Sequence, residues 1–297
     1  MTEEQIQKQK SWFDKYYKLM LIIPVIFILL SLVYLGIFYS KNHDFINKDT
    51  SLVGGTTITL TSKVTQESLE PQLKQKFPDV SFRKLTDLST GKQISLVVES
   101  SASSDELKSA IEQILNIKLT EQNSSIEFTG PTLSQGFYKQ LIIALVISFV
   151  LMSIVIFVLF RTFIPSIAVI FAAFSDIIMP LALLDYLGVK ISAAGIAAFL
   201  MLIGYSVDTD ILLTTRALKK REGTLNQRIY GAFKTGIFMT LTALVAVLPA
   251  FFIVTGLPDS FRQIFLILDL GLFEDIINNW LTNVGIIKCY CDKKGIK

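Results

Sequence analysis

The sequence predicts an α-helical membrane protein with six transmembrane segments and one α+β domain outside the membrane. Of its 297 residues, 51% are hydrophobic and 18% are charged, whereas soluble domains carry about 25% charged residues. The hydrophobic residues are gathered in blocks of about 20, the length that crosses a hydrocarbon core of about 30 Å. One long polar stretch, 40–138, separates the first block from the rest. A soluble enzyme is therefore close to excluded.

Six blocks are long and apolar enough to cross the membrane. They are 19–39, 140–160, 162–184, 191–213, 235–254 and 261–287. The first block exceeds the roughly 7–15 apolar residues of a signal peptide, so it is interpreted as a retained anchor. The sixth block is the most polar, which leaves five spans as the alternative. Its polar residues are Arg262, Asp269, Glu274, Asp275, Asn278 and Asn279.

Lysine and arginine residues set the expected orientation, because cytoplasmic loops carry an excess of them. Basic residues cluster before the first block, between the fourth and fifth, and after the sixth. The opposite short loops contain only Lys190 and Arg262. The sequence therefore predicts that 1–18 and 288–297 are cytoplasmic and that 40–138 lie outside the cell, while 19–39 and a five-helix bundle at 139–287 lie in the membrane.

The outside segment has a complete pattern of strands and helices. Strands are predicted at 56–62, 80–85, 93–99 and 125–129, with a turn at 88–91. One helix is predicted at 66–77, and a second begins at Ser104, which is the expected N-cap. The second helix carries apolar residues on one face, namely Leu107, Ile111, Ile114 and Leu115. The order β-α-β-β-α-β is the split βαβ, ferredoxin-like arrangement. Six spans with a domain after the first are typical of one half of a larger pseudo-symmetric transporter.

Carboxyl groups inside the apolar blocks are the candidate functional groups. Asp176 lies in the third block, and Asp208 and Asp210 lie in the fourth. Each costs about 2.5–3.5 kcal/mol at the middle of a bilayer, which favours proton or ion handling, with a structural hydrogen bond as the alternative. Residues 208 and 210 are about 200° apart on a helix. Asp208 shares its face with small residues such as Gly204, so we expect Asp208 to point into the bundle and Asp210 to lie near the wet boundary.

The remaining polar residues have plainer interpretations. Lys234 opens the fifth block, either as a boundary lysine or as a partner of the aspartates. Asp269, Glu274 and Asp275 either take part in the site or line a hydrated interface. His43 is expected in a solvated linker, and Cys289 and Cys291 as free thiols. No P-loop or metal-protease motif is present, so we expect no cofactor, metal, enzymatic activity or nucleic-acid partner.

Three short motifs resemble the SecF family of the SecDF protein-export complex, within the RND-type transporter superfamily. They are Gly54-Gly55-Thr56 at the start of the outside domain, Gly204-Tyr205-Ser206 ahead of Arg216, and Arg221-Glu222-Gly223-Thr224 followed by Lys234. The resemblance covers nearly the whole chain. It implies an RND-type half and an accessory subunit of protein export in the cell membrane, in contact with membrane lipids. It also implies three protein partners, namely a SecD-like six-helix subunit, a SecY-type channel and the unfolded polypeptide in transit.

The resemblance implies a proton relay that includes Asp176, Asp208, Asp210 and Lys234, but two positions depart from bacterial members. Those members read G-Y-S-x-N-D, which places their relay aspartate at Thr209 of this chain, and they have arginine where this chain has Lys234. The Asp-Thr-Asp variant and the stretch 275–280 look more like archaeal members. An RND-type exporter of small molecules or lipids and a passive scaffold of the translocation channel are the alternative functions.

Overall fold

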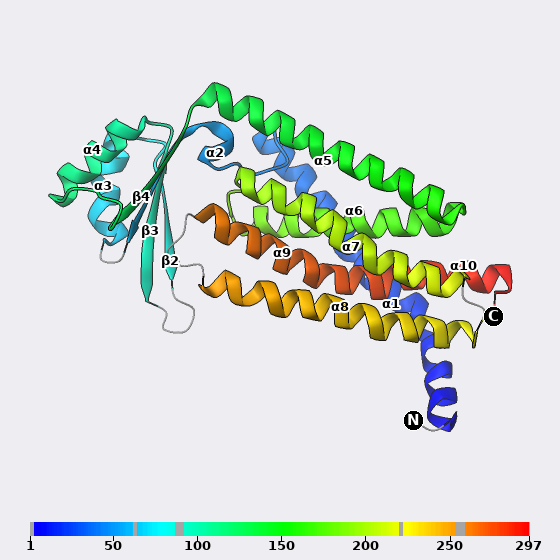
Figure 1. Cartoon of the computed structure of the whole chain (residues 1–297). Helices are drawn as coiled ribbons and strands as arrows, with labels where there is room; N and C mark the ends of the chain where they lie inside the picture. The colour runs from blue at the N-terminus through cyan, green and yellow to red at the C-terminus, as the bar shows by residue number, and fades with distance from the viewer. Residues whose placement is uncertain (1–2, 62–63, 87–91, 220–221, 254–258, 297) are drawn as a thin grey trace.

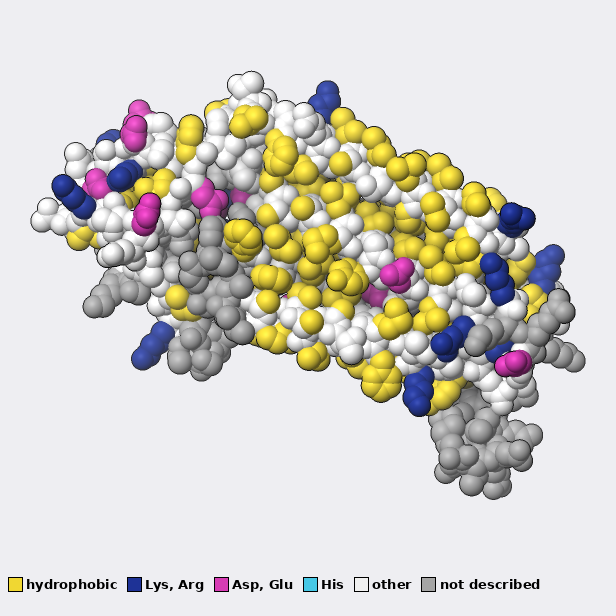
Figure 2. All heavy atoms as spheres, viewed as in Figure 1, with side chains coloured by type: hydrophobic (Ala, Val, Ile, Leu, Met, Phe, Trp, Pro, Cys, Tyr) yellow, Lys and Arg dark blue, Asp and Glu magenta, His cyan; other side chains and the backbone are white. Residues whose placement is uncertain are grey.

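The computed structural model describes residues 3–61, 64–86, 92–219, 222–253 and 259–296 (Figure 1). Long helices form a bundle, and a small α+β domain lies at the end of the bundle opposite both termini (Figure 1). Apolar side chains cover the middle of the visible face of the bundle (Figure 2). Most of the lysines and arginines visible in this view lie toward the two ends of the molecule. This distribution is that of a bundle whose sides face lipid.

Five helices of the described chain are long and apolar enough to cross a membrane, and they coincide with the first five predicted blocks to within two residues at the ends where they fall short of them. They are α1 (Glu3–Asn42), α5 (Pro131–Phe160), α6 (Phe163–Tyr186), α7 (Ala193–Lys219) and α8 (Leu225–Ile253). The predicted sixth block is not among them. It folds as α9 (Asp259–Ile277), the π-helical η1 (Asn278–Asn283) and α10 (Val284–Lys294). Charged residues along α9 and the asparagines of η1 lower the apolarity of this segment.

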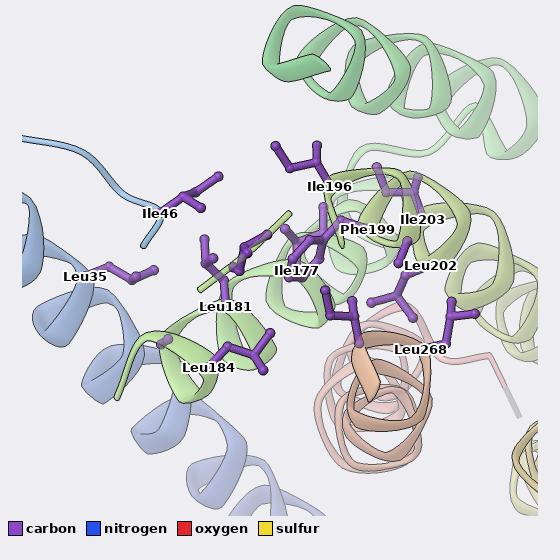
Figure 3. Packing of buried hydrophobic residues seen from close by; sticks show 14 of the residues in the cluster. Leu35, Ile46, Ile177, Leu181, Leu184, Ile196, Phe199, Leu202, Ile203 and Leu268 are labelled. Carbon is purple, nitrogen blue, oxygen red and sulfur yellow. The ribbon is translucent and has the colours of Figure 1, made fainter. Parts of the chain in front are cut away.

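The interior of the bundle explains why α9 is more polar than its neighbours. This helix packs against α6, α7 and α8, so its inward face meets protein instead of lipid. Gly271 allows the closest approach, because a Cβ atom there would lie 2.2 Å from Leu202 Cδ2 of α7. Figure 3 shows the apolar core between α1, α6, α7 and α9. Its buried members include Leu35, Ile177, Leu181, Leu184, Ile196, Phe199, Leu202, Ile203 and Leu268.

The α+β domain contains the predicted strands and helices in the predicted order. They are β1 (Gly55–Thr61), α3 (Gln66–Lys76), β2 (Ser81–Thr86), β3 (Gln93–Ser100), α4 (Ser104–Leu115) and β4 (Ser124–Thr129). The sheet order is β2-β3-β1-β4, and every neighbouring pair is antiparallel. The predicted N-cap was wrong by one residue, since Ser103 occupies that position and its side chain makes no capping hydrogen bond. The turn expected at 88–91 lies outside the described residues.

One face of the sheet builds the core of the domain. Ile58, Leu60, Leu96 and Val98 alternate with outward residues along β1 and β3 and pack beneath α3 and α4. From α4, Leu107 and Ile111 are buried and Ile114 and Leu115 pack against the same cluster, which confirms the predicted apolar face. This cluster shares no buried residue with the core of the bundle. The domain therefore has a hydrophobic core of its own.

The two chain connections between the bundle and the domain pass each other at Gly54. The short helix α2 (Thr50–Val53) leads into Gly54, and the chain returns at Pro131. A Cβ atom on Gly54 (φ +98°) would lie 2.4 Å from Pro131 Cα, and one on Gly55 (φ +139°) would lie 2.4 Å from the Ser100 oxygen. Both positions therefore require glycine. Thr56 is buried, and its hydroxyl donates to the Ala102 carbonyl at 2.7 Å.

Asp49, the N-cap of α2, predicts a pH dependence at this junction. Its carboxylate accepts hydrogen bonds from the Ser51 amide at 2.8 Å and the Ser51 hydroxyl at 2.6 Å. Burial nevertheless raises the pKa of Asp49 from 3.8 to about 6. Because the folded state then holds this proton more tightly than the unfolded chain, the stability of the cap falls as pH rises from about 4 to about 6.

Hydrogen exchange of the amides at 51–53 measures this effect. After correction for intrinsic rates, protection should be greater near pH 4 than near pH 7, and Asp49→Asn should remove the difference. Protection that increases with pH in the wild-type chain would contradict the assignment.

Candidate functional site

Three carboxyl groups from three helices lie inside the bundle. They belong to Asp176 of α6, Asp210 of α7 and Asp275 of α9, whose exposed fractions are 1%, 0% and 1%. The sequence marked the first two as candidates, while Asp275 was only one of several polar residues in the sixth block. Packing of α9 against both α6 and α7 brings the third carboxyl group into the interior.

The Asp176 carboxylate accepts hydrogen bonds from two other segments. The Ser206 hydroxyl of α7 donates to Asp176 Oδ2, and Asn278 Nδ2 of η1 donates to Asp176 Oδ1 at 2.6 Å. Ser206 closes the Gly-Tyr-Ser motif, so this motif contributes a direct ligand of the buried carboxylate. Asp176 thus joins α6, α7 and η1.

Asp275 contacts the position at which the resemblance places an aspartate in bacterial members. That position is Thr209 here, and its hydroxyl oxygen lies 3.2 Å from Asp275 Oδ1 and 2.9 Å from the Ser206 carbonyl oxygen. The Thr240 hydroxyl of α8 lies 3.4 Å from Asp275 Oδ2. Helix α9 therefore places a carboxyl group next to position 209 of α7.

Asp210 is the most deeply buried of the three and the least satisfied. Asn283 Nδ2 of η1 donates to Asp210 Oδ1 at 2.6 Å. Asp210 Oδ2 is buried and has no hydrogen-bond partner among the described residues. The oxygens of Thr214, one turn further along α7, and of Asn283 are also buried without partners there. The buried oxygens at this end of the cluster can therefore still accept a proton or a hydrogen bond from water.

Among the described residues, the donors that contact the three carboxyl groups are neutral hydroxyl or amide groups. None of the ion pairs found among the described residues reaches Asp176, Asp210 or Asp275. A buried carboxylate without a cation costs several kcal/mol, on the order of the penalty for desolvating an ion. A proton is the smallest group that can neutralise a carboxylate in such a setting.

Helix η1 supplies the site residues that the sequence interpretation missed. Asn278, Asn279, Thr282 and Asn283 are all 0% exposed. They follow Asp275 at positions i+3, i+4, i+7 and i+8, the pattern of one helical face. That spacing was a signal for an inward polar face in an otherwise apolar segment. Single π-turns inside long helices frequently occur at functional sites.

The prediction that Asp208 points into the bundle was wrong. Asp208 is exposed, whereas Asp210 is fully buried. The face of α7 that carries Phe199, Ile203 and Ser206 packs inside this chain, and the small-residue face with Gly204 points outward. Small residues do mark a close-packing face, but no helix of the described chain covers it at Gly204, where a Cβ atom would meet nothing within 4 Å.

The structure does not bring Lys234, Tyr205 or Arg216 into the cluster. Lys234 is exposed on α8, and Tyr205 is 48% exposed on α7. Arg216 instead joins two helices, because its Nη1 donates to the Gly231 carbonyl of α8. Glu274 is buried on α9, with Oε2 unpartnered among the described residues. His43 is exposed, and Cys289 and Cys291 are free.

Comparison with known proteins agrees with the motifs. Residues 110–293 match the family model for the C-terminal part of the protein-export membrane proteins SecD and SecF. The SecF protein of Methanolacinia petrolearia is 36% identical over 94% of this chain and 95% of its own length. The chain belongs to the SecF family. SecF of Methanocaldococcus jannaschii is likewise 36% identical, over 93% of this chain and 96% of its own.

Solved structures of SecDF share the fold of this SecF-family chain. SecDF from Thermus thermophilus superposes with a TM-score of 0.73 at 19% identity, covering 94% of this chain and 38% of that one. A SecDF structure in a super-membrane-facing form gives a TM-score of 0.58 at 20% identity and covers 92% of this chain. The chain thus spans 38% of the SecDF chains. The resemblance predicted from three motifs is confirmed, and with it an accessory role in Sec protein export.

Proposed function

We propose that this SecF-family chain forms one half of a protein-export complex that is driven by the proton gradient. The observation that carries the proposal is the cluster of Asp176, Asp210 and Asp275, which is buried at the contact of three helices and holds no cation among the described residues. A proton that enters the cluster changes its charge and therefore the hydrogen bonds that join α6, α7, α9 and η1. Burying three carboxyl groups inside a membrane is costly in free energy, which favours a functional role over that of a passive scaffold.

We infer that α9, η1 and α10 form the sixth transmembrane segment. Helix α9 packs against α6, α7 and α8, and η1 and α10 pack against α1, α6 and α7, which supports this because the neighbours shield the polar face from lipid. The position of both termini at the end of the bundle away from the domain (Figure 1) supports cytoplasmic termini at 1–18 and 288–297 and an outside domain at 40–138. With this orientation, we place residues 19–39 and 139–287 in the membrane. The sheet order and helix positions favour the split βαβ, ferredoxin-like class for the domain.

The outward face of α7 is the surface on which we place a SecD-like partner. Met201 and Tyr205 are about half exposed there, at 49% and 48%, and Gly204 and Asp208 are exposed beside them. A small residue lets a second helix approach closely, and a carboxyl group is tolerated at this depth when protein covers it. Coverage of only 38% of the SecDF chains leaves room for six further helices.

A leucine at Gly204 is expected to weaken association with the SecD-like partner without affecting the fold of this chain. A Cβ atom at Gly204 meets nothing within 4 Å in the chain itself, so only a helix from outside would be displaced. Copurification of the tagged chain with its partner measures the effect, and we expect at least about a tenfold loss. Gly36→Leu on α1, where the space is equally open, is the matched control. Equal retention of the partner by both variants would contradict the assignment of this face.

In the proposed mechanism, protonation of the cluster changes the packing of α6 against α7 and α9, and the outside domain moves with them. The domain would hold the unfolded polypeptide as it leaves a SecY-type channel and hinder its return. Export into vesicles under an imposed proton gradient tests the proposal. Chains with and without the buried carboxyl groups should differ only while the gradient is present. The same assay separates gradient coupling from a passive scaffold and from export of small molecules or lipids.

A further inference from the structure

The second face of the outside sheet is polar and turned away from the domain core. Side chains alternate along β3, so Glu99 lies on the face opposite Val98, a member of the core. The register pairs Glu99 with Ser81 of β2, and Arg83 follows on the same face. Arg83 Nη2 donates to Glu99 Oε1 at 3.1 Å. The side chain of Glu99 is only 5% exposed, so a charged group lies buried on this face.

The turn between α6 and α7 supplies the second cation for Glu99. Lys190 Nζ donates to Glu99 Oε2 at 2.7 Å and lies 2.7 Å from Ser81 Oγ. Lys190 therefore bonds two neighbouring strands of the domain, although it belongs to the bundle. Its own side chain is 33% exposed, so water and ions can reach the pair from one side.

The backbone of this turn is fixed to the bundle by Gln263 at the start of α9. Gln263 Nε2 donates to the Lys190 carbonyl, and Gln263 Oε1 accepts from the Ser192 amide at 2.6 Å and from its hydroxyl. The Ile191 amide donates to the Asn47 carbonyl at 2.6 Å. The turn is thus held by α9 and by the segment before α2, and it moves only when these helices move.

We infer that the Lys190–Glu99 ion pair holds the outside domain against the α6–α7 turn and can break reversibly, so that it couples the domain to the turn. This ion pair is called the latch below. The turn joins the helix that carries Asp176 directly to the helix that carries Ser206 and Asp210, so a shift of α6 against α7 is delivered to β2 and β3 through Lys190. The contact is polar and solvent-accessible, and the domain has a core of its own. It can therefore detach without unfolding. The role as a coupling element rests on the proposed function, but the latch itself does not.

Spin-label distance measurements on the full chain in lipid nanodiscs test the latch. Labels at Ser109→Cys on α4 and Val245→Cys on α8, both exposed, report the position of the domain relative to the bundle after Cys289→Ser and Cys291→Ala remove the native thiols. We expect a narrow distance distribution for the latched chain. Lys190→Met, which keeps the aliphatic stem, should raise the ratio of displaced to docked domain by about tenfold or more. Higher salt should broaden the latched distribution in the same direction.

Three comparisons make the result decisive. Lys190→Arg keeps the charge and should retain the narrow distribution, while Glu99→Gln should broaden it as Lys190→Met does. Lys84→Met removes the 2.8 Å ion pair with Glu67, which joins β2 to α3 within the domain, and should leave the distribution narrow. Narrow distributions in both latch variants, or equal broadening in Lys84→Met, would overturn the inference. Because the measurement needs neither partner nor substrate, failure of the proposed export function would leave it unchanged.

Discussion

Replacing Asp176 and Asp275 together with asparagine is expected to reduce gradient-driven export to the rate observed without a gradient. Asparagine has nearly the same shape, and its one amide oxygen can keep one of the two hydrogen bonds that Ser206 and Asn278 donate to Asp176, as well as the Thr209 bond to Asp275, but it cannot exchange a proton. The measurement is the late phase of export into vesicles that contain this chain and its partner. We expect a loss of about tenfold or more, since a group that exchanges protons contributes about 10²–10⁴-fold where it acts directly.

Stability measurements on the same variant separate a functional from a structural role. No ion pair is lost, and a buried group without a counter-charge becomes neutral, so the thermal midpoint should stay the same or rise. A large fall in the midpoint together with the loss of export would indicate that the aspartates serve as structural hydrogen-bond acceptors. Unchanged export in the double variant would also assign Asp176 and Asp275 to structure and would leave Asp210 as the one carboxyl group of the cluster able to exchange a proton.

Gly54→Ala is expected to destabilise the junction between domain and bundle by about 3 kcal/mol or more. The new Cβ atom would lie 2.4 Å from Pro131 Cα and 2.7 Å from its nitrogen, which are backbone atoms that cannot rotate away, and φ at this position is +98°. The chain connections that enter and leave the domain would be forced apart. Limited proteolysis or hydrogen exchange across 47–56 and 129–134 measures the effect.

Two other glycines separate the clash from the backbone conformation. Gly188 has φ +70° but open space around its Cβ position, so Gly188→Ala should cost only about 1–2 kcal/mol. Gly130 has open space and an ordinary φ of −66°, and Gly130→Ala should be nearly neutral. If Gly54→Ala costs no more than Gly188→Ala, the close approach of Pro131 does not decide the residue at position 54.

Much of the fold was predictable because local patterns determine it. The first five transmembrane helices follow from blocks of apolar residues, and the order of strands and helices in the domain follows from alternation and from the apolar face at Leu107 and Ile111. The sixth segment was harder to recognise. Its polar face is covered by other helices, where Asp275, Asn278 and Asn283 contact α6 and α7, and a local pattern cannot show whether a polar face will be covered.

The candidate site was predictable only in part, because it depends on which helices meet. Helical geometry separates Asp208 from Asp210 but does not say which face of α7 meets this chain and which remains open. The two donors to Asp176, Ser206 and Asn278, lie 30 and 102 residues away in sequence. The same distance in sequence hides the latch, since Glu99 and Lys190 are 91 residues apart.

Proton uptake into vesicles containing this chain and its SecD-like partner, under an imposed potential, tests the central claim most directly. Vesicles with the wild-type chain should take up protons, and Asp176→Asn with Asp275→Asn should stop the uptake. Asp208→Asn, on the outward face, should keep it wherever copurification shows that the partner is still bound. Uptake that persists without the carboxyl groups of Asp176 and Asp275, or that disappears only with Asp208, would contradict the account.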